Sequence, residues 1–171
     1  MVNQLLNGLT MLNNILEKIL IAVGLLCLVT FVSITGAEVF SRYLLSHSIH
    51  WSNEIARLTF LWSVYLSAAV GFRYREHLVL DLIQFPPGSW LAKGHEAVIL
   101  SLSFLFVMLF AVIGVITIQA DIARFYAITR ISYNWGYASL AVMGFAGVLF
   151  MLEVILNKIM GREQKTLSES K

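Results

Sequence analysis

The amino-acid sequence predicts an all-α membrane protein with four transmembrane helices in a single domain, residues 1–171. Hydrophobic residues make up 58% of the chain and charged residues 13%, whereas soluble domains average under half and about a quarter. Three long uncharged runs can each cross a bilayer as a helix, which takes about 20 apolar residues; they cover residues 19–37, 97–120 and 131–152. The predicted spans are residues 16–40, 51–74, 90–120 and 131–157, followed by a polar tail at 161–171.

The segment before the first span can be interpreted in two ways. Four leucines recur there at helical spacing among Asn and Gln side chains: Leu5, Leu9, Leu12 and Leu16. This pattern is typical of a short helix lying in the membrane interface, and a plain extension of the first span has the same spacing. The run is too long, and its flanks too poor in positive charge and small residues, for a removable signal peptide.

The second span is the shortest and needs residues from its flank. Residues 58–72 are uncharged but reach only about 22 Å as a helix at 1.5 Å per residue. The span therefore has to begin near Trp51, which brings Glu54 and Arg57 into the interface. Trp51 and Trp62 are expected to anchor this helix at the membrane surface.

The third and fourth spans contain long uncharged runs of their own. Pro86 and Pro87 separate the third span from the second, and Ser89 is a candidate N-cap. The one cysteine, Cys27, lies inside the first span, which excludes an intramolecular disulfide and a dithiol redox pair.

The distribution of Lys and Arg predicts that both termini lie in the cytoplasm. Four spans place the termini on one side, and cytoplasmic loops carry an excess of basic residues. The terminal side and middle loop hold the larger set: Lys18, Arg73, Arg75, Lys93, Lys158, Arg162, Lys165 and Lys171. The two remaining loops, which we expect outside, hold Arg42, Arg57, Arg124 and Arg130.

Ionisable residues cluster where the spans end. Helical spacing predicts the pairs Glu38–Arg42, Glu54–Arg57 and Asp121–Arg124 toward the outer face, and a shared face for Arg73, His77 and Asp81 toward the cytoplasm. Each pair alone is typical of a solvated helix end. No charge lies near the middle of a span, whereas a proton or ion pathway would need a carboxylate or histidine at that depth.

Small side chains line one face of the second span. The set, interrupted by Phe60 and Val70, is Ser52, Ala56, Thr59, Ser63, Ser67 and Gly71. Helices in lipid associate by close backbone approach along such faces. The stripe is therefore either a seam within this chain or a groove for another protein's helix.

The sequence holds no catalytic, metal or cofactor motif. The histidines are His47, His50, His77 and His95, all at helix ends or in loops, whereas a membrane haem needs facing histidines within spans. There is no phosphate-binding glycine loop and no serine nucleophile motif. The basic residues are scattered, so no nucleic-acid partner is expected. We expect no enzyme activity, no cofactor and no metal.

Three stretches together resemble the small membrane subunit of TRAP transporters, the DctQ type. They are FSRYLL (residues 40–45), WSNEIARLTFLW (residues 51–62) and GFRYREHLVLDLI (residues 71–83). The layout matches over roughly residues 20–155. One departure is visible: where that family commonly has two consecutive acids after the tryptophan, this chain has Asn53 and then Glu54.

The resemblance implies a non-catalytic, multi-pass subunit in the bacterial inner membrane. Its partners would be a large multi-span TRAP membrane subunit, which moves a small organic anion with sodium, and a periplasmic substrate-binding protein. The substrate class would be sialic acid or C4-dicarboxylates, with specificity set by the other subunits. The alternatives are a self-sufficient four-helix carrier or exporter acting as a homodimer, and an assembly factor without a transport role.

The same resemblance assigns roles to the charged residues. Arg42, Glu54 and Arg57 would brace the outer ends of the first two helices, and Arg73, His77 and Asp81 the inner ends. Structural or partner contacts are thus expected at Arg42, Trp51, Glu54, Arg57, Ser63, Ser67, Gly71, Arg73, His77 and Asp81. Contacts with the periplasmic protein are expected at Ser46, His47, His50, Arg124 and Arg130.

Overall fold

Four long helices make up the fold, and their arrangement is that of a multi-pass membrane protein. The computed structural model describes residues 2–74, 90–120 and 124–159. The helices are α1 (Val2–Leu44), α2 (Ser52–Tyr74), α3 (Trp90–Ala120) and α4 (Asn134–Ile159). Each is long and apolar enough to cross a membrane, which confirms the all-α, four-span prediction. His77, Asp81, Asp121 and the polar tail lie outside the described residues.

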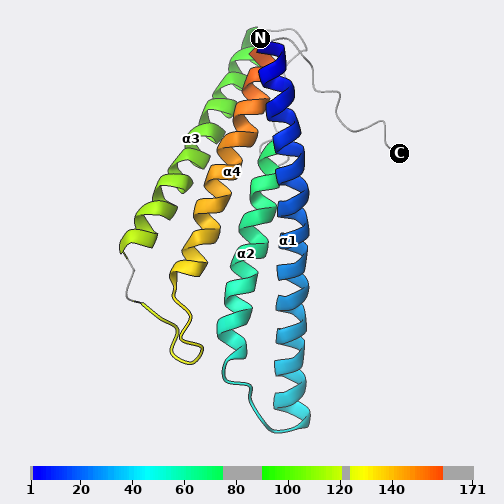
Figure 1. Cartoon of the computed structure of the whole chain (residues 1–171), viewed down its shortest axis with the longest axis vertical. Coiled ribbons are helices and arrows are strands. Elements are labelled where there is room, and N and C mark those ends of the chain that lie inside the picture. Colours follow the sequence, from blue (N-terminus) through cyan, green and yellow to red (C-terminus); the bar gives the residue numbers. More distant parts are fainter. Residues whose placement is uncertain (1, 75–89, 121–123, 160–171) are drawn as a thin grey trace, which may run out of the picture.

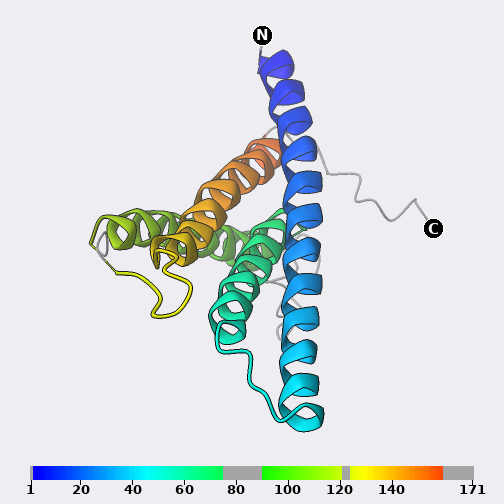
Figure 2. The same cartoon turned by 60° about the horizontal axis from the view of Figure 1, so that its bottom comes forward.

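Helix α1 is one continuous helix of 43 residues. At 1.5 Å per residue it is about 64 Å long, roughly twice the hydrocarbon thickness of a bilayer. The N-terminal leucines therefore belong to a plain extension of the first span and not to a separate interfacial helix. Figure 2 shows this extension continuing past the end of α4.

The helices stand in an open row, in the order α3, α4, α2, α1 (Figure 1). Helix α4 packs against both α3 and α2, and α2 packs against α1. The inner position of α4 shows in its burial, because 56% of its apolar stretch is buried compared with 11% for α1. The two outer helices consequently expose most of their apolar surface.

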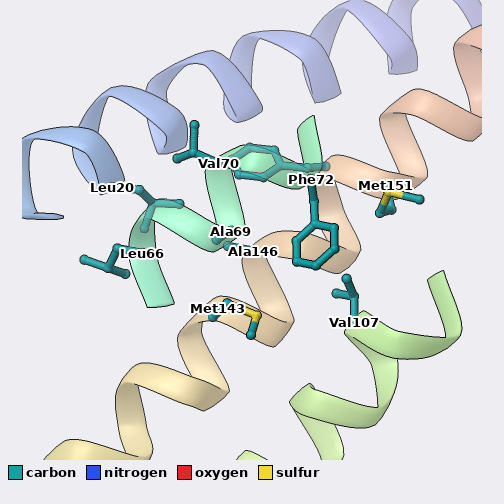
Figure 3. Close-up of a cluster of buried hydrophobic side chains, with 10 residues drawn as sticks. Leu20, Leu66, Ala69, Val70, Phe72, Val107, Met143, Ala146 and Met151 are labelled. Carbon is teal, nitrogen blue, oxygen red and sulfur yellow. The ribbon is translucent and has the colours of Figure 1, made fainter. Parts of the chain in front are cut away.

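The core lies where the four helices come nearest to one another. Figure 3 shows side chains from every helix, among them Leu20 of α1, Leu66 of α2, Val107 of α3 and Met143 of α4. Leu66 is 1% exposed and Val107 is fully buried. These close-packed side chains fix the rotation of each helix about its own axis.

Helices α3 and α4 cross with their backbones almost in contact. A Cβ atom added to Gly144 would lie 2.4 Å from the Cα atom of Ala111, and one added to Gly114 would lie 2.7 Å from that of Ala141. Such an approach is available only to residues with little or no side chain. The closest small-residue crossing is therefore between α3 and α4, which the sequence interpretation did not single out.

The small face of α2 packs in part against α1. A Cβ atom added to Gly24 of α1 would lie 3.6 Å from Leu66 Cβ, 3.8 Å from Ser67 Oγ and 3.9 Å from the carbonyl of Ser63. Ser63 is buried, Ser67 is exposed at the rim and Gly71 is half-buried. At this point the stripe forms a seam within the chain.

Candidate functional site

Polar side chains gather at the two ends of the row. The terminal end is where α2 and α4 finish, and the loop end is where the α1–α2 and α3–α4 loops lie. On α1, Glu17 belongs to the terminal end and Glu38 to the loop end, about 32 Å apart along the helix axis. That distance matches the ~30 Å thickness of a hydrocarbon layer, so the two clusters have the spacing expected for its two boundaries.

Arg73 of α2 is the centre of the cluster at the terminal end. Its Nη1 pairs with Glu17 Oε2 and its Nη2 donates to Asn14 Oδ1, both on α1. Its Nη2 also lies 3.6 Å from Glu153 Oε1 of α4. The side chain of Arg73 is only 10% exposed. One guanidinium thus joins three helices, and we call this group the Arg73 cluster.

Glu153 brings α4 into the Arg73 cluster. Its side chain is 2% exposed, and its Oε2 accepts a 2.6 Å hydrogen bond from Asn13 Nδ2 of α1. The same amide donates to the carbonyl of Leu149 at 3.2 Å. The ring of Phe150 lies 5.6 Å below the Arg73 guanidinium, a cation–π contact. A buried acid in a span needs such partners, because an unpaired charge there is costly.

Glu38 organises the α1–α2 loop. Its Oε1 accepts from Arg42 Nη2 at 2.6 Å and from Ser48 Oγ at 2.9 Å. Its Oε2 accepts from the backbone N–H of Ile49 and from Ser52 Oγ, both at 2.9 Å. The residue is 6% exposed. One carboxylate therefore links the end of α1, the loop and the first residue of α2.

Glu54 binds the α3–α4 loop. Its Oε1 accepts from the backbone N–H of Ile128 at 3.0 Å, and its Oε2 accepts from the N–H and the hydroxyl of Thr129, both at 2.7 Å. Among the residues that the structure describes, no ion pair joins Glu54 to Arg57. The predicted helix-end pair is therefore wrong, because two backbone amides of the loop satisfy this carboxylate instead. Arg57 is exposed.

The loop held by Glu54 is itself an ordered hairpin. Phe125 and Ser132 form an antiparallel bridge, and the rings of Tyr126 and Tyr133 stack with centroids 4.1 Å apart. Arg130 closes the turn with φ 58°, a left-handed conformation that is uncommon for a residue with a side chain. Burial raises the pKa of the Tyr126 hydroxyl above its usual value.

A further hydrogen bond ties α2 to the start of α4. Trp62 Nε1 donates to the carbonyl of Trp135 at 2.9 Å, so α2 holds both the hairpin and the helix that follows it. Trp51, the other expected anchor, is 47% exposed.

The residues expected to meet a periplasmic partner are divided between two loops. Ser46, with φ 50°, and the exposed His47 and His50 lie in the α1–α2 loop, whereas Arg124 and Arg130 lie in the α3–α4 hairpin. Ser41 Oγ donates to the carbonyl of His47 at 2.6 Å, which orders the first of these loops. In the described residues, no group of three or more His, Cys, Asp or Glu side chains is placed to hold a metal ion.

Sequence reasoning missed the α1 and α4 partners of Arg73. Asn14 and Glu17 stand at i,i+3 on α1, and Glu153 is the one acid of the fourth span. Their position at the borders of apolar runs was the signal in the sequence that could have identified them as candidates. Their pairing with Arg73 follows from helix order, which the sequence does not contain.

Comparison with known proteins gives one family and one curated relative. The family model for the DctQ component of the tripartite ATP-independent periplasmic transporters matches residues 31–161. The sialic acid TRAP transporter permease protein SiaT of Haemophilus influenzae (strain 86-028NP) is 27% identical over 128 residues, which cover 73% of this chain and 20% of that protein. The chain thus matches about a fifth of the relative's length. No solved structure matches.

Proposed function

Since the chain belongs to the DctQ component family of the tripartite ATP-independent periplasmic transporters, we propose that it is the small, non-catalytic membrane subunit of such a transporter. It sits in the bacterial inner membrane and supports a large transport subunit that imports a small organic anion together with sodium. A periplasmic binding protein delivers the anion. The curated relative is a sialic acid permease, which favours sialic acid or another organic acid as the substrate.

The observation that carries this proposal is the position of the charged contacts. Arg73 is paired at the terminal end, and Glu38 and Glu54 are bound at the loop end. Each contact joins one helix to another helix or to a loop, which holds the row together at both ends. A chain fixed in this way suits a stationary support for a moving partner.

The outer helices provide the surface for the large subunit. Apolar side chains recur at alternating spacings of four and three along α3 and are about half exposed or more: Val98, Leu102, Leu105, Leu109, Val112 and Ile116. A stripe with this period suits packing against another helix. Helix α1 exposes a similar surface, so lipid and the large subunit share the two outer faces.

Transport by reconstituted components tests the proposed role. We expect proteoliposomes with this chain alone to show no uptake of labelled sialic acid or C4-dicarboxylate. Adding the large subunit, the loaded binding protein and an inward sodium gradient should give uptake. Uptake by the chain alone would instead identify a self-sufficient carrier, and uptake by the large subunit without this chain would remove the supporting role.

We further propose that the two ordered loops at the loop end contact the binding protein. The α3–α4 hairpin is fixed by Glu54 and carries Arg124 and Arg130, and the α1–α2 loop carries His47 and His50. Charge reversal at Arg130 should raise the binding-protein concentration needed for half-maximal uptake. An unchanged concentration dependence for Arg130→Glu would rule out a contribution from this residue.

A further inference from the structure

A surface groove lies between α1 and α2 beside the α1–α2 loop. Its volume is about 220 Å³. Its lining comes from two helices: Thr35, Glu38, Val39, Arg42 and Tyr43 of α1, and Ser52, Asn53 and Ala56 of α2. Neither the family nor the proposed transport role assigns a ligand to this groove.

The lining changes from apolar to polar along the groove. The deeper part is made by Val39, Ala56 and Thr35, whose hydroxyl donates to the carbonyl of Phe31 at 2.8 Å. The part next to the loop is polar, and in it Arg42 is paired with Glu38 beside Tyr43, Ser52 and Asn53. The Arg42 side chain is the exposed member of this pair. An apolar stretch that ends at exposed guanidinium donors suits a molecule with a hydrocarbon chain and an anionic head.

Arg42 retains donors for such a head. Its Nη2 donates to Glu38, and this is the one hydrogen bond of its side chain among the described residues. A guanidinium has five N–H donors, and the Arg42 side chain is 54% exposed. Glu38 also lines the groove, but it is only 6% exposed. Its carboxylate is occupied by three other hydrogen bonds besides the one from Arg42.

The depth of Arg42 also fits. It lies one helical turn beyond Glu38, about 6 Å farther along α1. With Glu17 and Glu38 at the two boundaries of a ~30 Å hydrocarbon layer, Arg42 would lie just outside it, in the headgroup region. Tyr43 is 79% exposed, as expected for an aromatic side chain at the level of the headgroups. Phosphates of the adjoining leaflet lie at this depth.

We propose that the groove binds one glycerophospholipid of the adjoining leaflet. The phosphate accepts hydrogen bonds from the Arg42 guanidinium and the Asn53 amide, because planar guanidinium donors suit phosphate oxygens. The glycerol and the upper acyl chain lie along Val39 and Ala56. The bound lipid thereby fills the space between α1 and α2 where these helices meet the loop.

Native mass spectrometry of the full chain in detergent tests this proposal. The probes are dioleoylphosphatidylglycerol, dioleoylglycerol, which lacks the phosphate, and inorganic phosphate. We expect one phosphatidylglycerol molecule to be retained at low lipid concentration, and about tenfold weaker binding in Arg42→Gln. Asn53→Asp should also weaken binding, because it places a carboxylate beside the phosphate. Arg57→Gln is the matched control, since it removes the same charge from the same end outside the groove.

The outcomes distinguish a phospholipid site from nonspecific adsorption of lipid or anion. Asn53→Asp leaves the Glu38 contacts in place, so this variant tests phosphate binding even if Arg42→Gln fails to fold. Retention of phosphatidylglycerol by Asn53→Asp at wild-type affinity would overturn the proposal. Equal retention of dioleoylglycerol, an Arg57→Gln defect as large as that of Arg42→Gln, or binding of inorganic phosphate without the lipid would each overturn it as well. These results are independent of whether the chain supports transport.

Discussion

At the scale of single residues, the ionisable side chains described above mostly bind partners on other helices or loops. Arg73 meets Glu17 and Glu153 from two other helices, and Glu54 meets the backbone of a loop. Among the ion pairs of the described residues, the Glu38–Arg42 pair alone joins neighbours on one helix, and Glu38 also reaches Ile49 and Ser52. The ionisable residues therefore fix tertiary geometry.

Removing the guanidinium of the Arg73 cluster should be strongly destabilising. Arg73→Ala leaves two carboxylates without their cation, and breaking a buried pair costs about 3–5 kcal/mol. The measurement is the unfolding free energy of the purified chain in mixed micelles. The exposed Arg57→Ala is the control and should change it by less than about 0.5 kcal/mol. Equal effects of the two substitutions would show that the Arg73 cluster does not hold the helices together.

Glu54 should control the order of the α3–α4 hairpin. Glu54→Ala removes the acceptor of the Ile128 and Thr129 amides, so amide hydrogen exchange in residues 126–133 should accelerate by at least about tenfold. Arg57→Ala should leave this exchange unchanged. Hairpin protection that survives in Glu54→Ala would mean that the Tyr126–Tyr133 stack and the Trp62 hydrogen bond suffice.

At the scale of elements, the close approach of α3 and α4 stabilises their association by van der Waals packing. In lipid there is little hydrophobic driving force between helices, because the surrounding chains are as apolar as the side chains. Gly144 and Ala111 allow near-contact of the two backbones, which increases van der Waals packing along the crossing. Helix α3 packs chiefly against α4, so its position depends on this crossing.

The two glycines Gly144 and Gly36 give a matched test of that dependence. Gly144→Ala should lower the unfolding free energy by about 1–3 kcal/mol, because the new Cβ meets backbone atoms that have to move apart. Gly36 of α1 has no neighbour within 4 Å of an added Cβ, and Gly36→Ala should be neutral or stabilise by up to about 1 kcal/mol through helix propensity. Thermal unfolding of both variants in detergent measures the difference. Similar changes in both would mean that the crossing is not tight.

At the scale of the whole molecule, an open row leaves the outer helices unpaired on one side. Helix α4 is mostly buried and α1 mostly exposed, an asymmetry that a closed bundle of four helices would not have. The Arg73 cluster and the two loop contacts hold this row together at its ends. The open row therefore has apolar faces that are available to lipid and to a larger partner.

The orientation of the protein in the membrane, with both termini in the cytoplasm, remains a prediction from the Lys and Arg distribution. In a Cys27→Ser background, we expect His50→Cys to react with a membrane-impermeant maleimide added to intact spheroplasts. Ser170→Cys should react only after the membrane is permeabilised. The reverse pattern would place the termini outside and would also remove the proposed loop contacts with a periplasmic protein.

The sequence by itself determined the number of helices, their approximate positions and the family. These follow from local properties, because a bilayer of fixed thickness demands apolar runs of fixed length. Local spacing also identified Glu38 with Arg42 as a contact, since residues four apart on a helix are always neighbours. Local spacing did not predict the partner of Glu54. The spacing allows a pair with Arg57, but two backbone amides of the α3–α4 loop bind the Glu54 carboxylate instead.

Only the tertiary structure decided which helices meet and which charges bind one another. Glu17 and Arg73, or Glu54 and Thr129, are far apart in the chain, and nothing in their spacing joins them. Their contacts depend on the order of the row and on the rotation of each helix. Both depend on the packing of the core side chains and on the close approach of α3 and α4 at Gly114 and Gly144. Contacts between segments far apart in the chain depend on how the helix surfaces fit together in three dimensions. The local spacing of residues along the sequence does not specify that fit.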